Sequence, residues 1–174
     1  MTTSLTPGTA FPEISVDRLG GGQITTSGFD APFMTVLNVY RGLHCPRCQR
    51  QLGGLLAEMD TLNGLGAKLV AISTDPEDRA AKAAEEWGLG GIDVGYGLSI
   101  ETARSLGLHI SSSIADKETE FFAEPGVFLI GSDGVLWGSV VGASPFMRPD
   151  AAQILDALSV IKERSYPARG TVAA

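Results

Sequence analysis

The feature that most limits the folds open to this chain is a series of apolar, β-branched runs, each followed by a helical pattern. The runs lie at residues 33–40 (FMTVLNVY), 67–73 (AKLVAIS) and 92–96. The helices expected after them lie at residues 49–66, 74–87 and 99–106, respectively. Two further runs, 127–131 and 135–141, flank Ser-Asp-Gly and predict an antiparallel hairpin before a last helix at 149–163. This order predicts an α/β fold, with a mixed central β-sheet and helices on both faces.

Two short alternating pieces near the start predict an extension of this sheet. Residues 14–16 and 23–25 are separated by a triple glycine and indicate an N-terminal β-hairpin. Residues 109–124 show no clear period and are expected to form an irregular excursion. Because no repeat or linker interrupts the pattern, we expect a single domain over residues 1–166, followed by a flexible tail at 167–174.

The length and charge of the chain exclude several classes of function. A chain of 174 residues is long enough to bury a core without staples. Its net charge of −7 opposes binding to nucleic acid or to an anionic membrane. The N-terminal segment lacks the basic and apolar parts of a secretory signal, and no apolar run approaches the ~18 residues of a membrane span. We therefore expect a cytoplasmic protein, in which structural disulfides are rare.

Cys45 and Cys48, the only cysteines of the chain, lie where the strand at residues 33–40 ends and a helix begins. Open α/β sheets place their sites at this end of the strands. Two cysteines three residues apart on a first helical turn can form a disulfide, and the unpaired N–H groups of that turn favour the thiolate of the first. Pro46 makes the helix start sharp, and Arg41 adds positive charge. The spacing predicts a reactive dithiol, with Cys45 the more exposed thiol.

Other interpretations of the CxxC sequence stay open at this point. Zinc needs about four ligands, and the chain offers only two cysteines and two histidines, His44 and His109, so a metal site is disfavoured. Two inert buried thiols would pack as small hydrophobic residues, and the basic surroundings argue against that interpretation. His44 either tunes Cys45 or relays a proton, or it is an exposed loop residue. The acids at residues 75–78 are interpreted as capping and first-turn residues of a helix.

Several stretches of the chain together resemble a known family. They are TPGTAFPEIS, VLNVYRGLHCPRCQRQL, AKLVAISTDPED, VGYGLSIETARSLGL, EPGVFLIGSDGVL and YPARG. They resemble the peroxiredoxin-like branch of the alkyl hydroperoxide reductase/thiol-specific antioxidant (AhpC/TSA) family, over nearly the whole chain. The resemblance implies a thioredoxin-like fold and no bound cofactor, with electrons supplied by an external thiol reductant of the thioredoxin or glutathione type. It also makes a homodimer an expectation.

The resemblance assigns the two cysteines in two ways. In the peroxiredoxin register, Cys48 matches the peroxidatic cysteine and Cys45 falls on the threonine three residues before it. Arg41 then replaces the proline that begins the peroxiredoxin signature. In the thioredoxin register, Cys45 is instead the nucleophile and Cys48 is the resolving cysteine. Both registers stay open.

Three residues outside the CxxC sequence are also placed at the site by the resemblance. Arg148, in SPFMRP, matches a later arginine found in many peroxiredoxins. Pro125, in EPGVF, stands where typical peroxiredoxins carry an arginine and thioredoxins carry a cis-proline. A cis-proline there would bring Glu124 against the dithiol. The Glu124 carboxylate then either accepts a proton during thiol attack or faces water from an exposed loop.

Three functions compete on this evidence. The first is thiol-dependent reduction of hydrogen or alkyl peroxides, with the dithiol cycling to a disulfide. The second is disulfide exchange of the thioredoxin kind, in which Cys45 attacks a substrate disulfide and Cys48 resolves the mixed disulfide. The third is a non-catalytic redox sensor or binding module. The expected partners are a peroxide or disulfide substrate and a thiol reductant.

Overall fold

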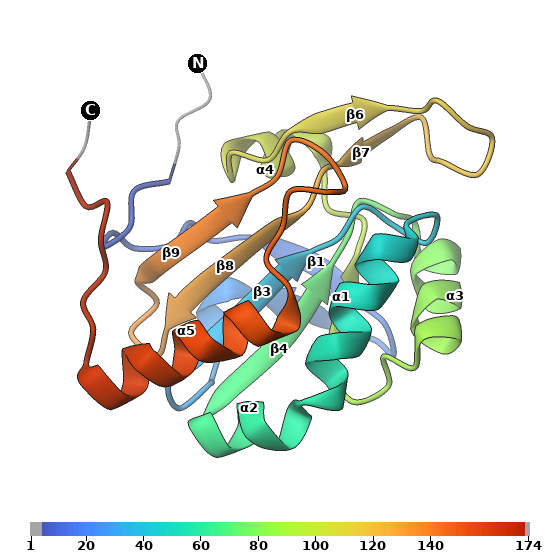
Figure 1. The fold of residues 1–174 in the computed structure, drawn as a ribbon. Coiled ribbons are helices and arrows are strands. Elements are labelled where there is room, and N and C mark those ends of the chain that lie inside the picture. Colours follow the sequence, from blue (N-terminus) through green and yellow to red (C-terminus); the bar gives the residue numbers. More distant parts are fainter. Residues whose placement is uncertain (1–4, 173–174) are drawn as a thin grey trace.

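A seven-stranded mixed sheet forms the centre of the structure, a computed structural model that describes residues 5–172 (Figure 1). The strand order is β2-β1-β5-β4-β3-β8-β9, with β3, β4 and β5 parallel to one another and β8 antiparallel to β3. The strands of this sheet are β1 (Ser15–Arg18), β2 (Gln23–Thr25), β3 (Met34–Val39), β4 (Ala67–Ile72), β5 (Asp93–Tyr96), β8 (Gly126–Gly131) and β9 (Leu136–Val141). The first residues of the expected domain and the last residues of the expected tail lie outside the described range.

The central strand β3 is buried on both faces, as a central strand of a layered α/β protein must be. Val36 packs into the core cluster on one face of the sheet, and Leu37 packs into the cluster on the other. On β4, Leu69 and Val70 divide between the same two clusters. This alternation follows from the two-residue period of a strand, and it fixes which side chains can meet each layer of helices.

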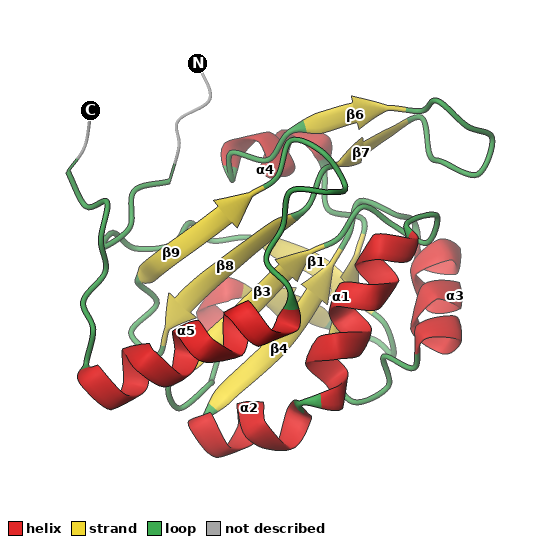
Figure 2. Cartoon of the chain, viewed as in Figure 1, coloured by secondary structure: helices red, strands yellow, loops and turns green. Residues whose placement is uncertain are grey.

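Helices cover both faces of the sheet, as the sequence predicts (Figure 2). One core cluster joins the sheet to α1, α2, α3 and α5, and the other joins it to α4 and the N-terminal residues. The helices are α1 (Pro46–Ala57), α2 (Met59–Leu65), α3 (Glu77–Trp87), α4 (Ile100–Ser105) and α5 (Ala151–Arg164), and a short 3-10 helix covers Thr26–Gly28. The expected single helix at residues 49–66 is in fact α1 and α2, separated at Glu58.

The N-terminal hairpin is present, since β1 pairs antiparallel with β2 and then joins β5 at the edge of the sheet. The expectation of an irregular excursion at residues 109–124 is wrong. Strands β6 (Ile110–Ser112) and β7 (Phe121–Ala123) pair antiparallel there, which makes a second hairpin outside the main sheet (Figure 1). The β6–β7 hairpin is too short to show a period in the sequence. No helix in the described part of the chain is long and apolar enough to span a membrane.

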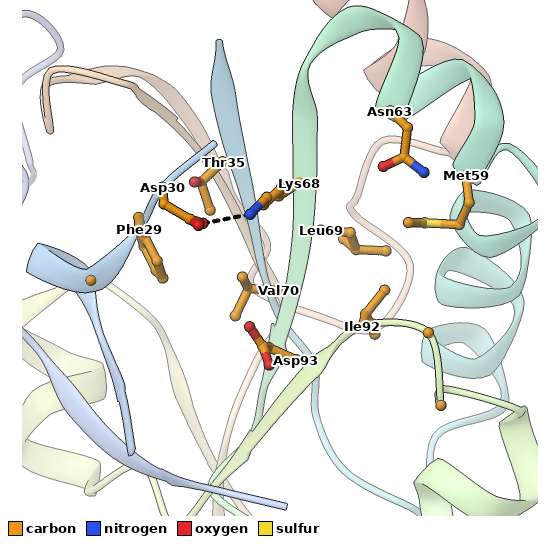
Figure 3. A pocket seen from close by; sticks show the side chains of 13 residues that line it. Phe29, Asp30, Thr35, Met59, Asn63, Lys68, Leu69, Val70, Ile92 and Asp93 are labelled. Atoms are coloured by element: carbon orange, nitrogen blue, oxygen red, sulfur yellow. Dashed lines mark hydrogen bonds and ion pairs between the residues drawn. The ribbon is translucent and has the colours of Figure 1, made fainter. Parts of the chain in front are cut away.

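A cavity of about 420 Å³ lies beside β4, away from the cysteines (Figure 3). Its polar lining includes Asp30, Lys68 and Asn63. Lys68 Nζ and Asp30 Oδ1 are already paired at 2.6 Å, so these two charges neutralise each other. Neither cysteine lines the cavity, so it is not a site of thiol chemistry.

Candidate active site

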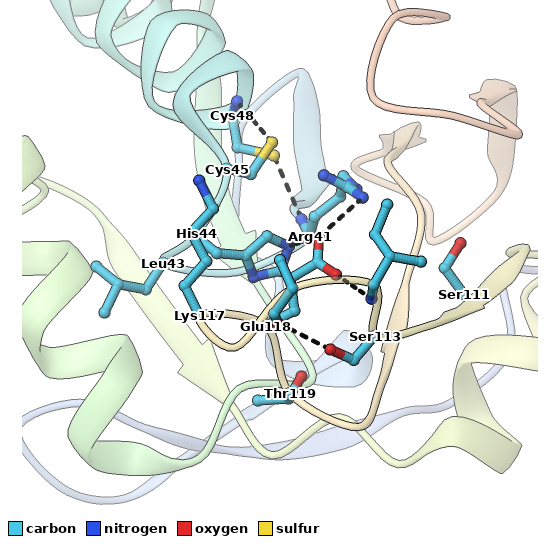
Figure 4. Close-up of polar contacts among 12 residues, drawn as sticks. Arg41, Leu43, His44, Cys45, Cys48, Ser111, Ser113, Lys117, Glu118 and Thr119 are labelled. Carbon is cyan, nitrogen blue, oxygen red and sulfur yellow. Dashed lines mark hydrogen bonds and ion pairs between the residues drawn. The ribbon is translucent and has the colours of Figure 1, made fainter.

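The two cysteines begin α1 directly after β3 and the 40–44 loop, where the sequence places them. Cys45 is the N-cap residue of α1, and its Sγ accepts a hydrogen bond from the Cys48 N–H at 3.4 Å (Figure 4). Pro46 occupies the start of the helix, where its missing N–H costs nothing. Both cysteines are free thiols in this structure. The N-cap geometry therefore directs a helix-end N–H at the sulfur of Cys45.

Arg148 reaches the dithiol from the loop between β9 and α5. Its Nη1 donates to Cys48 Sγ at 3.1 Å, and its Nη2 lies 3.9 Å from Cys45 Sγ. Gln51 accepts from the same Nη1 at 3.3 Å and donates to the carbonyl of Pro149 at 2.7 Å. Gln51 thus holds both the guanidinium and the loop that carries it. The structure places the Arg148 guanidinium beside both sulfurs.

Arg41 contacts the dithiol from the loop that joins β3 to α1. Its backbone N–H donates to Cys48 Sγ at 3.3 Å. Its guanidinium pairs with Glu124 at 3.0 Å and lies 3.9 Å from Glu118, and it stacks over the Phe122 ring at 4.8 Å. Glu124 also accepts from the Ser111 hydroxyl at 2.7 Å. Glu124 is therefore not an exposed loop acid but a buried partner of Arg41, and it reaches the thiols through that arginine.

His44 is buried beside the same group of charges. Its ring meets Phe122 edge to face at 4.7 Å, and its Nε2 lies 4.0 Å from a Glu118 oxygen. Neither ring nitrogen has a hydrogen-bond partner among the described residues. Burial lowers the pKa of His44, and the neighbouring Arg41 lowers this pKa further. The alternative of an exposed loop histidine is therefore wrong, and burial favours the neutral imidazole.

The pKa values of the two thiols are shifted in opposite directions, which favours the thiolate on Cys45. A hydrogen bond from the Cys48 thiol is the largest of several effects that lower the pKa of Cys45 to about 4. The Cys48 N–H, Arg41 and Arg148 lower this pKa as well. Burial raises the pKa of Cys48, so Cys48 keeps its proton even though it lies closer to Arg148. Cys45 is 1% exposed and Cys48 is 0% exposed, so both thiols are buried and Cys45 is not an exposed thiol.

Comparison with known proteins assigns this dithiol to a family. A profile of the AhpC/TSA family matches residues 7–138, which include β3, the CxxC sequence and the β6–β7 hairpin. The chain belongs to the AhpC/TSA family. It is a thiol oxidoreductase with a thioredoxin-like fold, as the sequence led us to expect. A search of curated protein sequences finds no significant match.

Solved structures share the fold of this AhpC/TSA protein at low sequence identity. A mutant of peroxiredoxin 6 from Arenicola marina is 20% identical, with a TM-score of 0.79 over 93% of this chain and 76% of that one. Reduced Prx3 from Vibrio vulnificus, solved in complex with hydrogen peroxide, is 19% identical, with a TM-score of 0.75 over 88% and 99% of the two chains. The thioredoxin domain of a thiol-disulfide oxidoreductase from Bacteroides vulgatus is 16% identical, with a TM-score of 0.66 over 91% and 99%.

The expectation of a cis-proline at position 125 is wrong. No peptide bond between described residues is cis, so the Glu124–Pro125 bond is trans. The Glu124 N–H donates to the carbonyl of His109 at 2.8 Å, and the Pro125 carbonyl accepts from the Gly142 N–H at 2.8 Å. The chain therefore passes from β7 into β8 as one extended segment that is held on both sides. Pro125 is buried, and its ring packs beneath Gly142.

Asp75 does not cap α3, contrary to the sequence interpretation. Its buried carboxylate accepts from the Leu43 N–H at 2.7 Å and pairs with Arg79 at 3.1 Å. Gly42 has a φ of +132°, and a Cβ there would lie 2.7 Å from the Asp75 oxygens. The carboxylate therefore holds the loop before Cys45, and this loop passes too close to it for any residue but glycine.

We expect Asp75→Ala to lower the free energy of unfolding by about 2–4 kcal/mol, because it leaves a buried N–H and the Arg79 guanidinium without their partner. Urea denaturation followed by circular dichroism measures this loss. Asp78→Ala, at an exposed position in the first turn of α3, is the control and should cost less than about 1 kcal/mol. Equal losses in the two variants would show that Asp75 acts only as a first-turn acid.

Two residues of the site, Glu118 and Gln51, are not among those that the sequence predicts. Glu118 lies in the loop of the β6–β7 hairpin and accepts from the Ile114 N–H at 2.8 Å. That hydrogen bond is the main cause of its lowered pKa, and His44 and Arg41 lower the pKa further. Gln51 stands one helical turn after Cys48, and this spacing is the only sequence feature that places it beside the thiol. The described residues contain no cluster of three or more potential metal-binding side chains.

The alkylation rate of Cys45 is expected to change little from about pH 8 down to about pH 5, and then to fall tenfold per unit. The pKa of Cys45, lowered to about 4, keeps this thiol ionised over that range. An ordinary thiol would already lose reactivity below about pH 8.5. Iodoacetamide labelling of the reduced wild-type protein, with the alkylated cysteine identified by peptide mass spectrometry, measures the profile. A rate that already falls tenfold per pH unit below pH 8 would contradict a stabilised thiolate.

Proposed function

We propose that the protein reduces hydrogen or alkyl peroxides, with Cys45 as the attacking thiolate and Cys48 as the resolving thiol. The observation that supports this function most is the position of Arg148, 3.1 Å from Cys48 Sγ and 3.9 Å from Cys45 Sγ. A guanidinium at this position stabilises the thiolate and also the negative charge that develops on the departing peroxide oxygen. Arg41 adds a second guanidinium, which Glu124 holds in place.

The proposed cycle has three steps. The Cys45 thiolate attacks one peroxide oxygen and the O–O bond breaks, so Cys45 becomes a sulfenic acid while the other oxygen takes a proton and leaves as water or alcohol. The sulfur of Cys48 then attacks the sulfenic acid sulfur, and water leaves as the Cys45–Cys48 disulfide forms. Two thiol groups of an external reductant finally return both cysteines to the reduced state and are themselves joined as a disulfide.

The burial of both sulfurs favours a peroxide over a protein disulfide as the substrate. A peroxide is small enough to reach Cys45 after a slight movement of the surrounding side chains. A protein disulfide would need the first turn of α1 to open, because both thiols are almost fully covered. Disulfide exchange remains the second candidate, since the fold also resembles a thioredoxin domain of a thiol-disulfide oxidoreductase.

Two assays run side by side test this choice. We expect hydrogen peroxide to oxidise the reduced protein about 100-fold or more faster than it oxidises free cysteine, because preorganised donors stabilise the transition state. Insulin-disulfide reduction by the same preparation should be slow. The opposite pattern would make the protein a disulfide oxidoreductase. Failure of both assays, with a dithiol that still titrates, would favour a redox sensor.

A further inference from the structure

A cavity of about 390 Å³ lies between α1 and the segment that leads into α5, directly outside Arg148. Its apolar wall includes Phe146, which is 66% exposed, and Ala151. Its polar wall carries the side chains of Arg47, Arg50 and Arg148. Small-molecule sites have volumes of about 300–1,000 Å³ and combine apolar walls with a few polar groups. The cavity has the size and lining of such a site.

Two of the three arginines of this cavity, Arg47 and Arg50, have no anionic partner among the described residues. None of its three arginines forms an ion pair with a carboxylate of residues 5–172. Arg47 instead lies over the Phe146 ring at 4.4 Å. Asp150 also lines the cavity, but its carboxylate caps α5 by accepting the Gln153 N–H at 2.8 Å. In a chain with a net charge of −7, the unpaired guanidinium groups of Arg47 and Arg50, next to that of Arg148, indicate an anionic ligand.

Arg148 couples this cavity to the redox state of the dithiol. In the reduced protein its guanidinium is drawn to the sulfurs, where Cys48 Sγ lies at 3.1 Å. A disulfide carries no negative charge, so oxidation leaves Arg148 without that partner and available to a ligand. Coupling between two sites is reciprocal, and an anion that uses Arg148 must therefore bind the oxidised protein more tightly than the reduced protein. A peroxide has to meet the reduced protein, whereas a reductant has to meet the oxidised one.

We propose that this cavity binds the carboxylates of a small-molecule thiol that reduces the Cys45–Cys48 disulfide. The inference rests on the proposed dithiol cycle. One thiolate attacks a sulfur of the disulfide, which releases the other cysteine as a thiolate. A second thiol molecule then attacks the mixed disulfide and leaves with the first as a small disulfide, so both cysteines are reduced. The returning negative charge draws Arg148 back to the sulfurs and releases the carboxylates.

Calorimetry with S-methylglutathione, which keeps both carboxylates and has no thiol, tests the binding site. We expect its affinity for the oxidised protein to be at least about fivefold higher than its affinity for the reduced protein. The double variant Arg47→Met/Arg50→Met should bind it at least about tenfold more weakly than the wild type does, since each arginine supplies charge-assisted hydrogen bonds. The control Arg104→Met, at an exposed position on α4, should bind it as the wild type does. No binding, or equal binding by the double variant, would overturn the proposal.

Reduction kinetics test the role of the site. Glutathione should reduce the disulfide of the double variant about tenfold more slowly than that of the wild type, while uncharged dithiothreitol should reduce both at the same rate. If the double variant is reduced equally slowly by both reductants, then no small carboxylate thiol uses the cavity. The same conclusion follows if the reduction rate depends on these arginines only when the reductant is an acidic protein. Peroxide consumption driven by dithiothreitol tests the dithiol cycle separately, so the two proposals can fail independently.

Discussion

Replacing Cys45 with serine is expected to lower the rate constant for oxidation by hydrogen peroxide by about 1,000-fold or more, because it removes the attacking thiolate. Cys45 is the sulfur that accepts the helix-end N–H of Cys48 and whose pKa is lowered to about 4. Cys48 keeps its proton and cannot substitute for it, since burial raises its pKa. Stopped-flow mixing of reduced protein with peroxide, with quenched samples analysed by mass spectrometry, measures the loss.

The matched variant Cys48→Ser separates the two registers of the CxxC sequence. It should keep a fast first oxidation, but the product should be a sulfenic acid on Cys45 that a dimedone probe traps, with no intramolecular disulfide. If Cys48→Ser abolishes the fast reaction and Cys45→Ser keeps it, then the peroxiredoxin register is correct and Cys48 is the peroxidatic cysteine.

Arg148→Met is expected to slow oxidation by peroxide by about 100-fold, the size of effect found when one donor to a developing charge is removed. It should also raise the pKa of Cys45, because Arg148 is one of the groups that lower it. The variant should fold normally, since the Arg148 side chain lies at the mouth of the site and Gln51 can still hold Pro149. Peroxide kinetics and the pH profile of Cys45 alkylation measure the two effects.

Two further variants make the Arg148 result specific. Arg148→Lys keeps the charge but loses the paired N–H groups that reach both sulfurs, so it should recover only part of the rate. Arg104→Met removes a positive charge at an exposed position on α4 and should leave peroxide kinetics unchanged. A wild-type rate and an unshifted thiol titration in Arg148→Met would show that this arginine takes no part in the chemistry.

The sequence predicts those parts of the structure that depend on local pattern. The run at residues 33–40 is mostly apolar because β3 is covered on both faces, and this can be seen without knowing what covers it. A helix start after that strand, marked by Pro46, is also local, so the dithiol could be placed at the correct end of the sheet. The later hairpin of β8 and β9 follows from its turn sequence.

The sequence does not predict which distant polar residues meet the dithiol. Asp75 has the sequence context of a helix cap, and only the path of the 40–44 loop over α3 gives it Leu43 as a partner. Glu118 reaches Arg41 and His44 only because β6 and β7 pair and fold their loop back over them. Such contacts join segments more than 30 residues apart in the chain, and neither propensity nor periodicity encodes them.

The most direct test of peroxide reduction by this dithiol is a single turnover with one equivalent of hydrogen peroxide. Reduced protein is mixed rapidly with the peroxide and quenched with acid at increasing times. The mass of the intact protein is then measured by mass spectrometry. We expect the protein to lose two hydrogens as the Cys45–Cys48 disulfide forms, about 100-fold or more faster than free cysteine is oxidised under the same conditions. Oxidation no faster than that of free cysteine, in a protein that rapidly reduces insulin disulfides, would contradict peroxide reduction as its function.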